Sequence, residues 1–503
     1  FINFLCLVAQ RKGMVIFMSL INVKNLTFSY EGSFDNIFEN VSFCIDTDYK
    51  LGFIGRNGRG KTTFLKLLIG EYQYSGKIES SVEFEYFPYR VNDEEFAIDL
   101  AYEKNPQLEY WQLARELNLL DIPEDVLYRP FKTLSPGERV KVMTAIMFTK
   151  ENKFMLIDEP TNHLDSDGRS LLSKYLNSKK GFILVSHDRD LINGCADHIL
   201  SINRTDIEVM RGNFSTWEEN YERRREFELS KNEHLQKDID RLQTAAKRTG
   251  LWSGKTEASK FGSGPVDRGF IGHKSAKMMK RAKSIERRRS AAIDEKSGLL
   301  KNIERTDTLK LSPLSSPGTL LELKNVSIFI GNNKICGPVS FALKDGERLI
   351  LSGKNGSGKS SILKLILGTE FDFTGTLYRK SGLKISYVPQ DTSELNGNMS
   401  DYAANRGIDE SKLKTILRKL GFERVQFEKD MSALSEGQKK KVLIAASLCE
   451  SAHIYIWDEP MNYVDVISRM QIEELIKRYS PTMLLVEHDA AFRRAIGAEI
   501  AAL

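Results

Sequence analysis

The sequence has no long apolar stretch. Its 503 residues contain no run of about 18 apolar residues, the length that a membrane-spanning helix needs. We therefore expect no membrane-spanning segment and no membrane partner. Any role at a membrane would need a separate subunit to supply the spanning helices.

Cysteine is scarce and scattered. The five cysteines, Cys6, Cys44, Cys195, Cys336 and Cys449, include no C-x-x-C pair. Zinc ribbons and disulfide frameworks need closely spaced cysteines, so the spacing argues against both. The pattern is typical of a protein in the reducing cytoplasm.

The composition indicates globular domains. Apolar residues make up 41% of the chain and charged residues 28%, the balance of a globular protein. One hydrophobic core rarely serves so long a chain, so we expect two domains of about 150–250 residues each. The weakly apolar segment Phe1 to Phe17 is interrupted by Arg11 and Lys12 and has no cleavage site, so we expect residues 1–17 to be a non-native or disordered extension.

A motif repeat divides the chain into two similar halves. The pattern G-x-x-x-x-G-K-[ST] begins at Gly55 and again at Gly353, 298 residues downstream. Three other motifs follow each copy of this P-loop pattern in the same order. They are Leu-Ser-x-Gly around Ser135 and Ser435, Asp-Glu-Pro from Asp158 and Asp458, and Val-x-His-Asp around His187 and His488. Four motifs repeated in one order and with similar spacing predict two copies of one domain.

Each P-loop motif falls between an apolar segment and an expected helix, the context that a phosphate-binding loop requires. The glycines allow backbone N–H groups to surround phosphates, and the lysine reaches the terminal phosphate. A glycine-rich turn before a core helix is the alternative for one motif alone. The residues assigned to ATP are Gly55, Arg56, Asn57, Gly58, Arg59, Gly60, Lys61, Thr62 and Thr63, and Gly353, Lys354, Asn355, Gly356, Ser357, Gly358, Lys359, Ser360 and Ser361.

Two acidic residues end a buried strand in each half. Asp158 and Asp458 have the placement of a magnesium-directing aspartate, with Thr62 and Ser360 as the hydroxyl ligands. The next residues, Glu159 and Glu459, are placed to act as general bases on the attacking water. Surface acids at strand ends are the alternative, which the repeated Pro-x-Asn-x-x-Asp after both glutamates disfavours.

A histidine follows an apolar segment in each half. His187 and His488 are expected to hydrogen-bond the γ-phosphate of ATP, a role that needs no bound proton. An isolated histidine in this position is ordinarily a core residue, but the repeated spacing favours function.

Together these motifs resemble those of ATP-binding cassette ATPases over roughly residues 20–210 and 320–503. The resemblance implies an α/β fold: two P-loop NTPase cores, each with antiparallel β and helical subdomains. It also implies that the signature of one cassette covers the ATP held by the P-loop of the other. The signature residues are Ser435, Glu436, Gly437 and Gln438 opposite Lys61, and Ser135, Pro136, Gly137 and Glu138 opposite Lys359.

Two positions of the resemblance differ between the halves. Tyr30 fits the aromatic residue on which adenine stacks, whereas the second half has Ile330 there. Gln390 matches the family's Mg²⁺-contacting glutamine, whereas the first half has Tyr89. A tyrosine cannot replace the glutamine carbonyl, so the two ATP sites are expected to differ in rate or in coupling.

Between the halves lies a segment rich in Glu, Lys, Arg, Leu and Gln, which predicts two long helices and a loop. We therefore divide the chain into cassette 1 (residues 18–217), a helical hairpin (218–311, tip about 250–273) and cassette 2 (312–503). Residues 241–289 carry a balance of +11 against +5 for the whole chain, which points to a polyanion.

Folded RNA suits this hairpin best, because a 30-residue helix is about 45 Å long and its tip carries aromatic and basic residues together. A solvated helix face, a membrane-surface helix and ordinary hydrophobic docking of the aromatics are the alternatives. The candidate RNA contacts are Arg248, Trp252, Lys255, Lys260, Phe261, Arg268, Phe270, Lys274, Lys277, Lys280 and Arg281.

Two cassettes, a charged hairpin and Glu-Pro-Thr-Asn-His-Leu-Asp from Glu159 resemble the ABC-F group. Trp457 to Tyr463, the short C-terminus and the Gly-rich tip are similar to Lsa-type antibiotic-resistance proteins. That resemblance implies a cytoplasmic monomer whose cassettes close on ATP and Mg²⁺ at the 70S ribosome. The hairpin would enter the exit site beside the peptidyl-site tRNA, contact 23S rRNA and displace lincosamides, pleuromutilins or streptogramin A. A housekeeping translation factor and the ATPase subunit of a drug exporter are the competing hypotheses.

Overall fold

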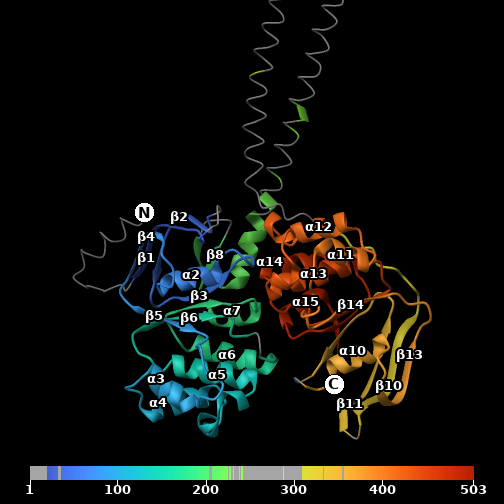
Figure 1. Ribbon diagram of the computed structural model, residues 1–503, viewed down its shortest axis with the longest axis horizontal. Helices are drawn as coiled ribbons and strands as arrows, with labels where there is room; N and C mark the ends of the chain where they lie inside the picture. The colour runs from blue at the N-terminus through green and yellow to red at the C-terminus, as the bar shows by residue number, and fades with distance from the viewer. Residues whose placement is uncertain are drawn as a thin grey trace, which may run out of the picture. The chain divides into compact units, whose positions relative to one another are not determined.

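The computed structural model describes residues 20–31, 36–161, 164–202, 207–224, 309–331, 333–353 and 356–503, with single positions at 226, 227, 230, 237, 240, 241 and 287. Contacts divide the chain into two compact units. One contains both cassettes, as Phe1–Ser215 and Asp307–Leu503, and the other is Thr216–Thr306. Figure 1 labels the elements, with cassette 1 in blue to green and cassette 2 in yellow to red.

Cassette 1 is built on a six-stranded sheet with the order β5-β6-β7-β3-β8-β9, parallel except for the last strand. Strands such as Lys153–Asp158 form because an apolar run buried on both faces suits a parallel sheet. The strands are β5 (Glu83–Phe87), β6 (Lys153–Asp158), β7 (Phe182–Val185), β3 (Lys50–Ile54), β8 (His198–Ile202) and β9 (Ile207–Arg211).

A second, antiparallel sheet of cassette 1 has the order β2-β1-β4. One hydrophobic core joins it to the parallel sheet, with Phe38, Phe53 and Phe64 fully buried in the cluster. These strands are β1 (Leu20–Phe28), β2 (Phe38–Asp46) and β4 (Ser75–Ser80). The P-loop helix contributes Phe64 to this core, which anchors the start of that helix.

The remaining helices of cassette 1 pack in a second core around Phe131 and Leu113. Helix α5 begins at Pro136 because Ser135 caps it: the Ser135 hydroxyl accepts from Glu138 N and the Glu138 carboxylate accepts from Ser135 N. The helices are α2 (Lys61–Leu68), α3 (Ala97–Lys104), α4 (Tyr110–Leu119), α5 (Pro136–Met147), α6 (Ser166–Asn177) and α7 (Arg189–Cys195).

Cassette 2 repeats this architecture. Its parallel sheet has the order β14-β15-β16-β12-β17 and its antiparallel sheet the order β11-β10-β13. The strands are β10 (Thr319–Ile330), β11 (Asn333–Lys344), β12 (Arg348–Ser352), β13 (Asp372–Arg379), β14 (Ile385–Val388), β15 (Ile454–Asp458), β16 (Met483–Val486) and β17 (Glu499–Ala502). The helices are α10 (Lys359–Leu367), α11 (Met399–Asn405), α12 (Glu410–Lys419), α13 (Glu436–Cys449), α14 (Val466–Tyr479) and α15 (Ala490–Ile496).

The expected arrangement of two P-loop cores, each with an antiparallel sheet and a helical subdomain, is therefore confirmed. Leu309 and Leu311, counted with the hairpin above, are buried in the helical core of cassette 2. Residues 214–224 are helical, so this helix begins within the segment assigned above to cassette 1, and most of the predicted hairpin lies outside the described residues. Within the described part of the chain, no helix combines the length and hydropathy that a bilayer crossing requires.

The order of the parallel strands places the chemical groups. In each cassette the P-loop follows a strand that lies beside the strand preceding the motif histidine, His187 or His488, which is called the switch histidine below. The strand that ends in the acidic pair is next in line. The carboxyl ends of parallel strands meet at one edge of the sheet, which is where ligands bind in open α/β sheets. The P-loop, the acidic pair and the histidine are thereby brought to one edge.

Candidate functional site

The two P-loops have a backbone that few residues can adopt. Gly60 lies at φ 89°, and a Cβ there would come within 2.5 Å of Ile37, so only glycine fits. Gly358 lies at φ 88° at the equivalent point of cassette 2. The lysines fold back over their loops: Lys61 Nζ donates to Gly55 O at 2.8 Å, and Lys359 Nζ donates to Gly353 O at 2.8 Å. Each ammonium therefore lies against the loop that would surround phosphates.

Asn57 collects several polar contacts around the first P-loop. Its Oδ1 accepts from Lys61 Nζ at 3.3 Å and lies 3.0 Å from His187 Nε2, which must donate because a carboxamide oxygen only accepts. Burial first, with the nearby Lys61 and Arg469, lowers the pKa of His187 well below 6.5. A neutral His187 and Lys61 thus share one acceptor, as two ligands of a single phosphate oxygen would.

The acidic pair of cassette 1 has two distinct environments. Asp158 Oδ2 accepts from Thr62 Oγ1 at 2.7 Å and from Tyr86 OH at 3.2 Å, whereas its Oδ1 is buried without a hydrogen-bond partner. A hydroxyl beside a carboxylate with a spare oxygen fits Mg²⁺, which usually takes one or two protein oxygens and completes its shell with phosphate and water. Asp158 and Thr62 would hold the ion here.

Glu159 is held in a strained and poorly solvated position. It has φ 50°, in the left-handed region that costs a non-glycine residue about 1–3 kcal/mol. Burial and the charge of Asp158 raise the pKa of the Glu159 carboxyl to about 8. His187 Nε2 lies 3.2 Å from Glu159 Oε1. A carboxylate with a raised pKa beside the phosphate-facing groups is suited to accept a proton from water.

Cassette 2 presents the same groups with different partners. Glu459, at φ 47°, accepts from Gln390 Nε2 at 2.9 Å and from Asn462 Nδ2 at 2.6 Å through its Oε2. Burial, followed by the charges of Glu487 and Asp458, raises the pKa of Glu459. Burial and the charges of Lys359 and Arg169 lower the pKa of His488 to about 4. The second base is therefore more strongly hydrogen-bonded than the first.

The aspartate and hydroxyl pair of cassette 2, Asp458 and Ser360, resembles the pair of Asp158 and Thr62 in cassette 1. Asp458 Oδ1 is buried without a hydrogen-bond partner, and a hydrogen bond from Ser360 opposes the rise that burial causes in the Asp458 pKa. Gln390 contacts Glu459, the residue that follows Asp458. Among the described residues, no group of three or more His, Cys, Asp or Glu side chains is placed to hold a metal ion.

The first pocket, site 1, has a volume of about 410 Å³ and takes groups from both cassettes. The P-loop and acidic pair of cassette 1 face the signature at the start of α13 in cassette 2. Its lining residues are Tyr30, Ile37, Asn57, Gly58, Gly60, Lys61, Thr62, Thr63, Asp158, Glu159, Val185, His187, Ser435, Glu436, Gly437 and Tyr463.

The second pocket, site 2, has a volume of about 700 Å³ and reverses this arrangement. The P-loop of cassette 2 faces the signature at the start of α5. Its lining residues are Ser135, Pro136, Gly137, Glu138, Lys141, Leu164, Asp165, Gly168, Arg169, Ile335, Gly356, Gly358, Lys359, Ser360, Ser361, Gln390, Glu459, Asn462 and His488. The structure thus brings each signature to the P-loop of the other cassette.

Some predicted ATP residues contact the opposite cassette instead of lining a pocket. Arg56, 6% exposed, donates to Lys419 O at 3.4 Å, and Arg59 lies 3.2 Å from Glu423 Oε1 in an ion pair. Gln438 closes the capping box of Ser435. Asp458, Gly55, Gly353 and Ser357 lie beside the pockets without lining them. Lys354, Asn355 and all eleven RNA candidates of the hairpin lie outside the described residues.

Two aromatic positions differ in outcome. Tyr30 lines site 1, where its hydroxyl lies 2.7 Å from Thr63 Oγ1 and the residue is 41% exposed. Tyr89 lies away from the pockets, with Lys104 Nζ and Lys150 Nζ each 5.6 Å from its ring centroid. Tyr86, which the motifs did not single out, touches Asp158 instead.

A family comparison identifies the two halves. The sequence matches the family described as ABC transporter over residues 38–162 and 336–462, one match in each half. The chain belongs to this family. Both matched segments contain a P-loop, a signature and an acidic pair, so the chain carries two ABC ATPase domains.

Several curated proteins resemble nearly the whole of this ABC protein. The ribosome protection protein VmlR of Bacillus subtilis is 28% identical over 92% of this chain and 83% of its own length. The ATP-binding protein Uup of Buchnera aphidicola is 28% identical over 94% and 79%, and a probable ATP-binding cassette sub-family F member 3 homologue of Encephalitozoon cuniculi is 27% identical over 91% and 76%. The resemblance to the ABC-F group is confirmed.

Solved structures agree with this ABC fold. The ribosome recycling factor aABCE1 of archaea, in a crystal structure with the ribosomal stalk protein aP1, superposes with a TM-score of 0.59 at 19% identity. The match covers 95% of this chain and 89% of that protein. At this identity the likeness establishes a shared fold of two cassettes and no more.

Proposed function

We propose that both pockets bind and hydrolyse ATP with Mg²⁺, and that hydrolysis lets the two cassettes separate. The observation that carries this proposal is the composition of the pockets, since each joins the P-loop of one cassette to the signature of the other. A nucleotide held between them would favour the closed arrangement, because a ligand shifts a conformational equilibrium only through contacts that one state provides.

The chain's own groups divide the work of hydrolysis. Lys61 and His187 would hold the terminal phosphate at site 1, and Glu159 would take the proton of the attacking water. Lys359, His488 and Glu459 would do the same at site 2. Mg²⁺ would neutralise the charge that develops on the phosphate oxygens. Tyr30 would stack on adenine at site 1, and Gln390 would reach the ion at site 2.

We further propose that this ATPase acts on the ribosome and protects it from drugs at the peptidyl transferase centre. The similarity to VmlR over 92% of the chain supports this, as does the balance of +11 in residues 241–289, which suits contact with RNA. In this proposal the hairpin enters the exit site of the 70S ribosome, contacts 23S rRNA near the peptidyl-site tRNA, and displaces lincosamides, pleuromutilins or streptogramin A.

Co-sedimentation with ribosomes tests the proposal. The Glu159→Gln, Glu459→Gln double variant should bind ATP without hydrolysing it, and we expect it to pellet with 70S ribosomes only when ATP is added. The Lys61→Ala, Lys359→Ala double variant is the matched control and should not pellet under either condition. A base-lacking variant that binds ATP and never pellets would contradict ribosome binding while leaving ATP hydrolysis intact.

A housekeeping role in translation is the second candidate. It is favoured by Uup and the Encephalitozoon cuniculi protein, whose names carry no mention of protection and which match this chain about as well as VmlR does. Susceptibility of cells to the three drug classes, with and without the protein, separates the two. Unchanged susceptibility together with ATP-dependent ribosome binding would support the housekeeping role.

A further inference from the structure

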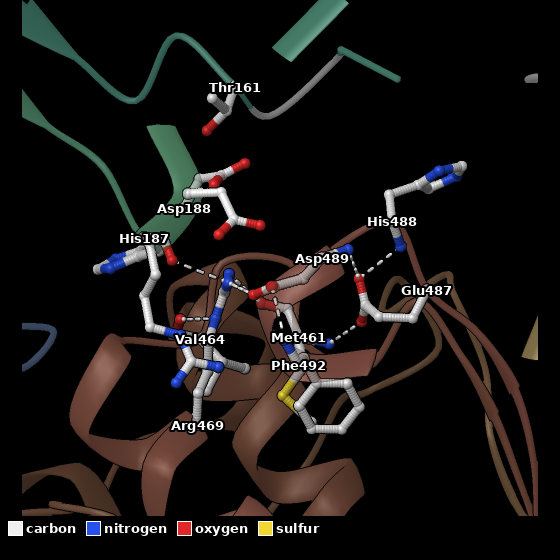
Figure 2. Close-up of polar contacts among 12 residues, drawn as sticks. Thr161, His187, Asp188, Met461, Val464, Arg469, Glu487, His488, Asp489 and Phe492 are labelled. Atoms are coloured by element: carbon white, nitrogen blue, oxygen red, sulfur yellow. Dashed lines mark hydrogen bonds and ion pairs between the residues drawn. The ribbon is translucent and has the colours of Figure 1, made fainter. Parts of the chain in front are cut away.

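The switch histidine of cassette 2 is tied to the segment after strand β15 by one buried carboxylate. Glu487 is 4% exposed, and its Oε1 accepts from His488 N at 2.8 Å and from Asp489 N at 3.1 Å. Its Oε2 accepts from Met461 N at 3.2 Å, as Figure 2 shows. The two oxygens of one buried carboxylate therefore connect the backbone of His488 to the backbone of Met461.

Arg469 in α14 continues this connection into cassette 1. It is 5% exposed, and its guanidinium donates to Met461 O at 2.7 Å and to Val464 O at 2.9 Å. Its Nη1 donates both to Asp489 Oδ2 at 2.7 Å and to His187 O at 2.9 Å. Figure 2 shows the guanidinium between Asp489 of cassette 2 and His187 of cassette 1. The planar fork holds acceptors from both cassettes at fixed angles.

Cassette 1 has no matching carboxylate at these positions. Ser186 stands where cassette 2 has Glu487, and Thr161 stands where it has Met461; their hydroxyls lie 3.3 Å apart. Arg169, the counterpart of Arg469, donates to Leu164 O at 3.0 Å and to Asp188 Oδ2 at 3.3 Å, both within cassette 1. Of these two arginines, Arg469 donates a hydrogen bond to the backbone of the other cassette's switch histidine, whereas Arg169 acts on His488 through its charge.

We propose that Glu487 and Arg469 are positioning residues that couple the two ATP sites, so that the position of His488 at site 2 and the position of His187 at site 1 depend on each other. This inference rests on the proposed ATP hydrolysis and adds a pathway to it. The path is contiguous: His488, Glu487, Met461, Arg469 and His187 are joined by hydrogen bonds of 3.2 Å or less. Buried networks of this kind have few alternative arrangements, which suits them to transmit a change between sites.

Site-specific turnover tests the coupling. Glu159→Gln leaves only site 2 active and Glu459→Gln leaves only site 1 active, so each single variant reports one site. We expect the kcat of the parent to differ from the sum of the two single-variant values by about fivefold or more, the range of ordinary coupling between sites.

Two independent changes remove the path. Arg469→Ala deletes the crossing hydrogen bond, and the Met461→Thr, Glu487→Ser double variant installs the residues that cassette 1 has at these positions. In each background we expect the kcat measured with both Glu159 and Glu459 present to equal the sum of the two site-specific kcat values. The KM for ATP should stay within about twofold of that of the unchanged protein. A merely structural role would lower all three kcat values together and would leave their relationship unchanged.

Arg494→Ala is the control, because Arg494 also crosses to cassette 1, pairing with Asp190 at 2.6 Å, but is exposed and outside the path. In the Arg494→Ala background, we expect the kcat to differ from the sum of the two site-specific kcat values by the same factor as in the unchanged protein. Three outcomes would each overturn the coupling while leaving ATP hydrolysis in place. These are a kcat in the unchanged protein that equals the sum of the site-specific values, a difference from that sum that persists in both path variants, and loss of all turnover in the Met461→Thr, Glu487→Ser variant. Absence of ATP hydrolysis in the parent would overturn the proposed function and, with it, this inference.

Discussion

Arg189 in cassette 1 and Glu473 in cassette 2 form an ion pair through two hydrogen bonds, with both side chains only 7% exposed. The two residues lie 284 positions apart in the sequence, so the pair depends on the two cassettes meeting. Together with Arg469 it places two buried arginine contacts between the cassettes. The contact between the cassettes therefore includes buried charges.

Removing one partner of this pair should weaken the cassette contact. Arg189→Ala leaves the Glu473 carboxylate buried without its partner, which typically costs about 3–5 kcal/mol. We expect a lower thermal unfolding midpoint and weaker ATP-dependent closure. The Arg189→Leu, Glu473→Leu double variant should recover most of the loss, because two apolar side chains leave no unpaired charge. Equal losses in the single and double variants would contradict this account.

The pH dependence of hydrolysis at site 1 should follow Glu159. Burial and Asp158 raise the pKa of Glu159 to about 8, and the base works only when it is deprotonated. In the Glu459→Gln variant, kcat/KM for ATP should therefore rise with pH to a midpoint near 8, since kcat/KM reports the free enzyme. A profile that is flat between about pH 6 and pH 9 would show that another group limits this site.

Gly437 is tightly packed against both cassettes. A Cβ at this position would lie 2.4 Å from Tyr463 O and 2.7 Å from Asn57 Nδ2, and these two atoms themselves share a 2.6 Å hydrogen bond between the cassettes. Gly437→Ala should cost about 1–3 kcal/mol of closure at site 1, a typical penalty of overpacking. Turnover should fall in the Glu459→Gln background and change little in the Glu159→Gln background. Equal losses at both sites would refute a local effect.

Lys440 is a buried residue that hydrogen-bonds the backbone of segments at site 2. It is 2% exposed and donates to Pro389 O, Gln390 O and Asp458 O at 2.8–3.2 Å, although burial lowers its pKa to about 8. Val140 occupies the same position of α5 in cassette 1. Lys440→Val leaves three carbonyl groups without this donor, so we expect turnover at site 2 to fall by about tenfold, as for a loss of 1.4 kcal/mol. Lys439→Val is the control, because Lys439 pairs with Glu436 at 3.2 Å instead of with these carbonyl groups. A similar fall in that variant would contradict a specific role for Lys440.

The two cassettes, their P-loops, acidic pairs and switch histidines were all predicted from the sequence. Phosphate binding needs consecutive residues, such as Gly55 to Thr62, because one loop must surround one phosphate group. A local pattern of this kind is visible without the fold. Similarly, Ser135 and Glu138 announce a helix start, because the capping box joins residues three positions apart.

Other predictions depended on more than local pattern. Tyr89 occupies the place of a glutamine in the sequence motif, yet it packs between Lys104 and Lys150, and Tyr86 takes the contact with Asp158. The direction in which a side chain leaves its strand decides this, and the motif carries no record of it. The expected difference in rate between the two sites stays a prediction.

Sequence alone determined which groups could bind and hydrolyse ATP, because phosphate chemistry restricts residue type and spacing within each half. Tertiary structure decided how the halves cooperate. Arg469 and His187 lie 282 positions apart, and nothing in either local sequence marks a contact between them. The contact arises because the segment after β7 of cassette 1 meets helix α14 of cassette 2. A hydrogen bond between such distant segments depends on the folded geometry and not on any spacing along the chain.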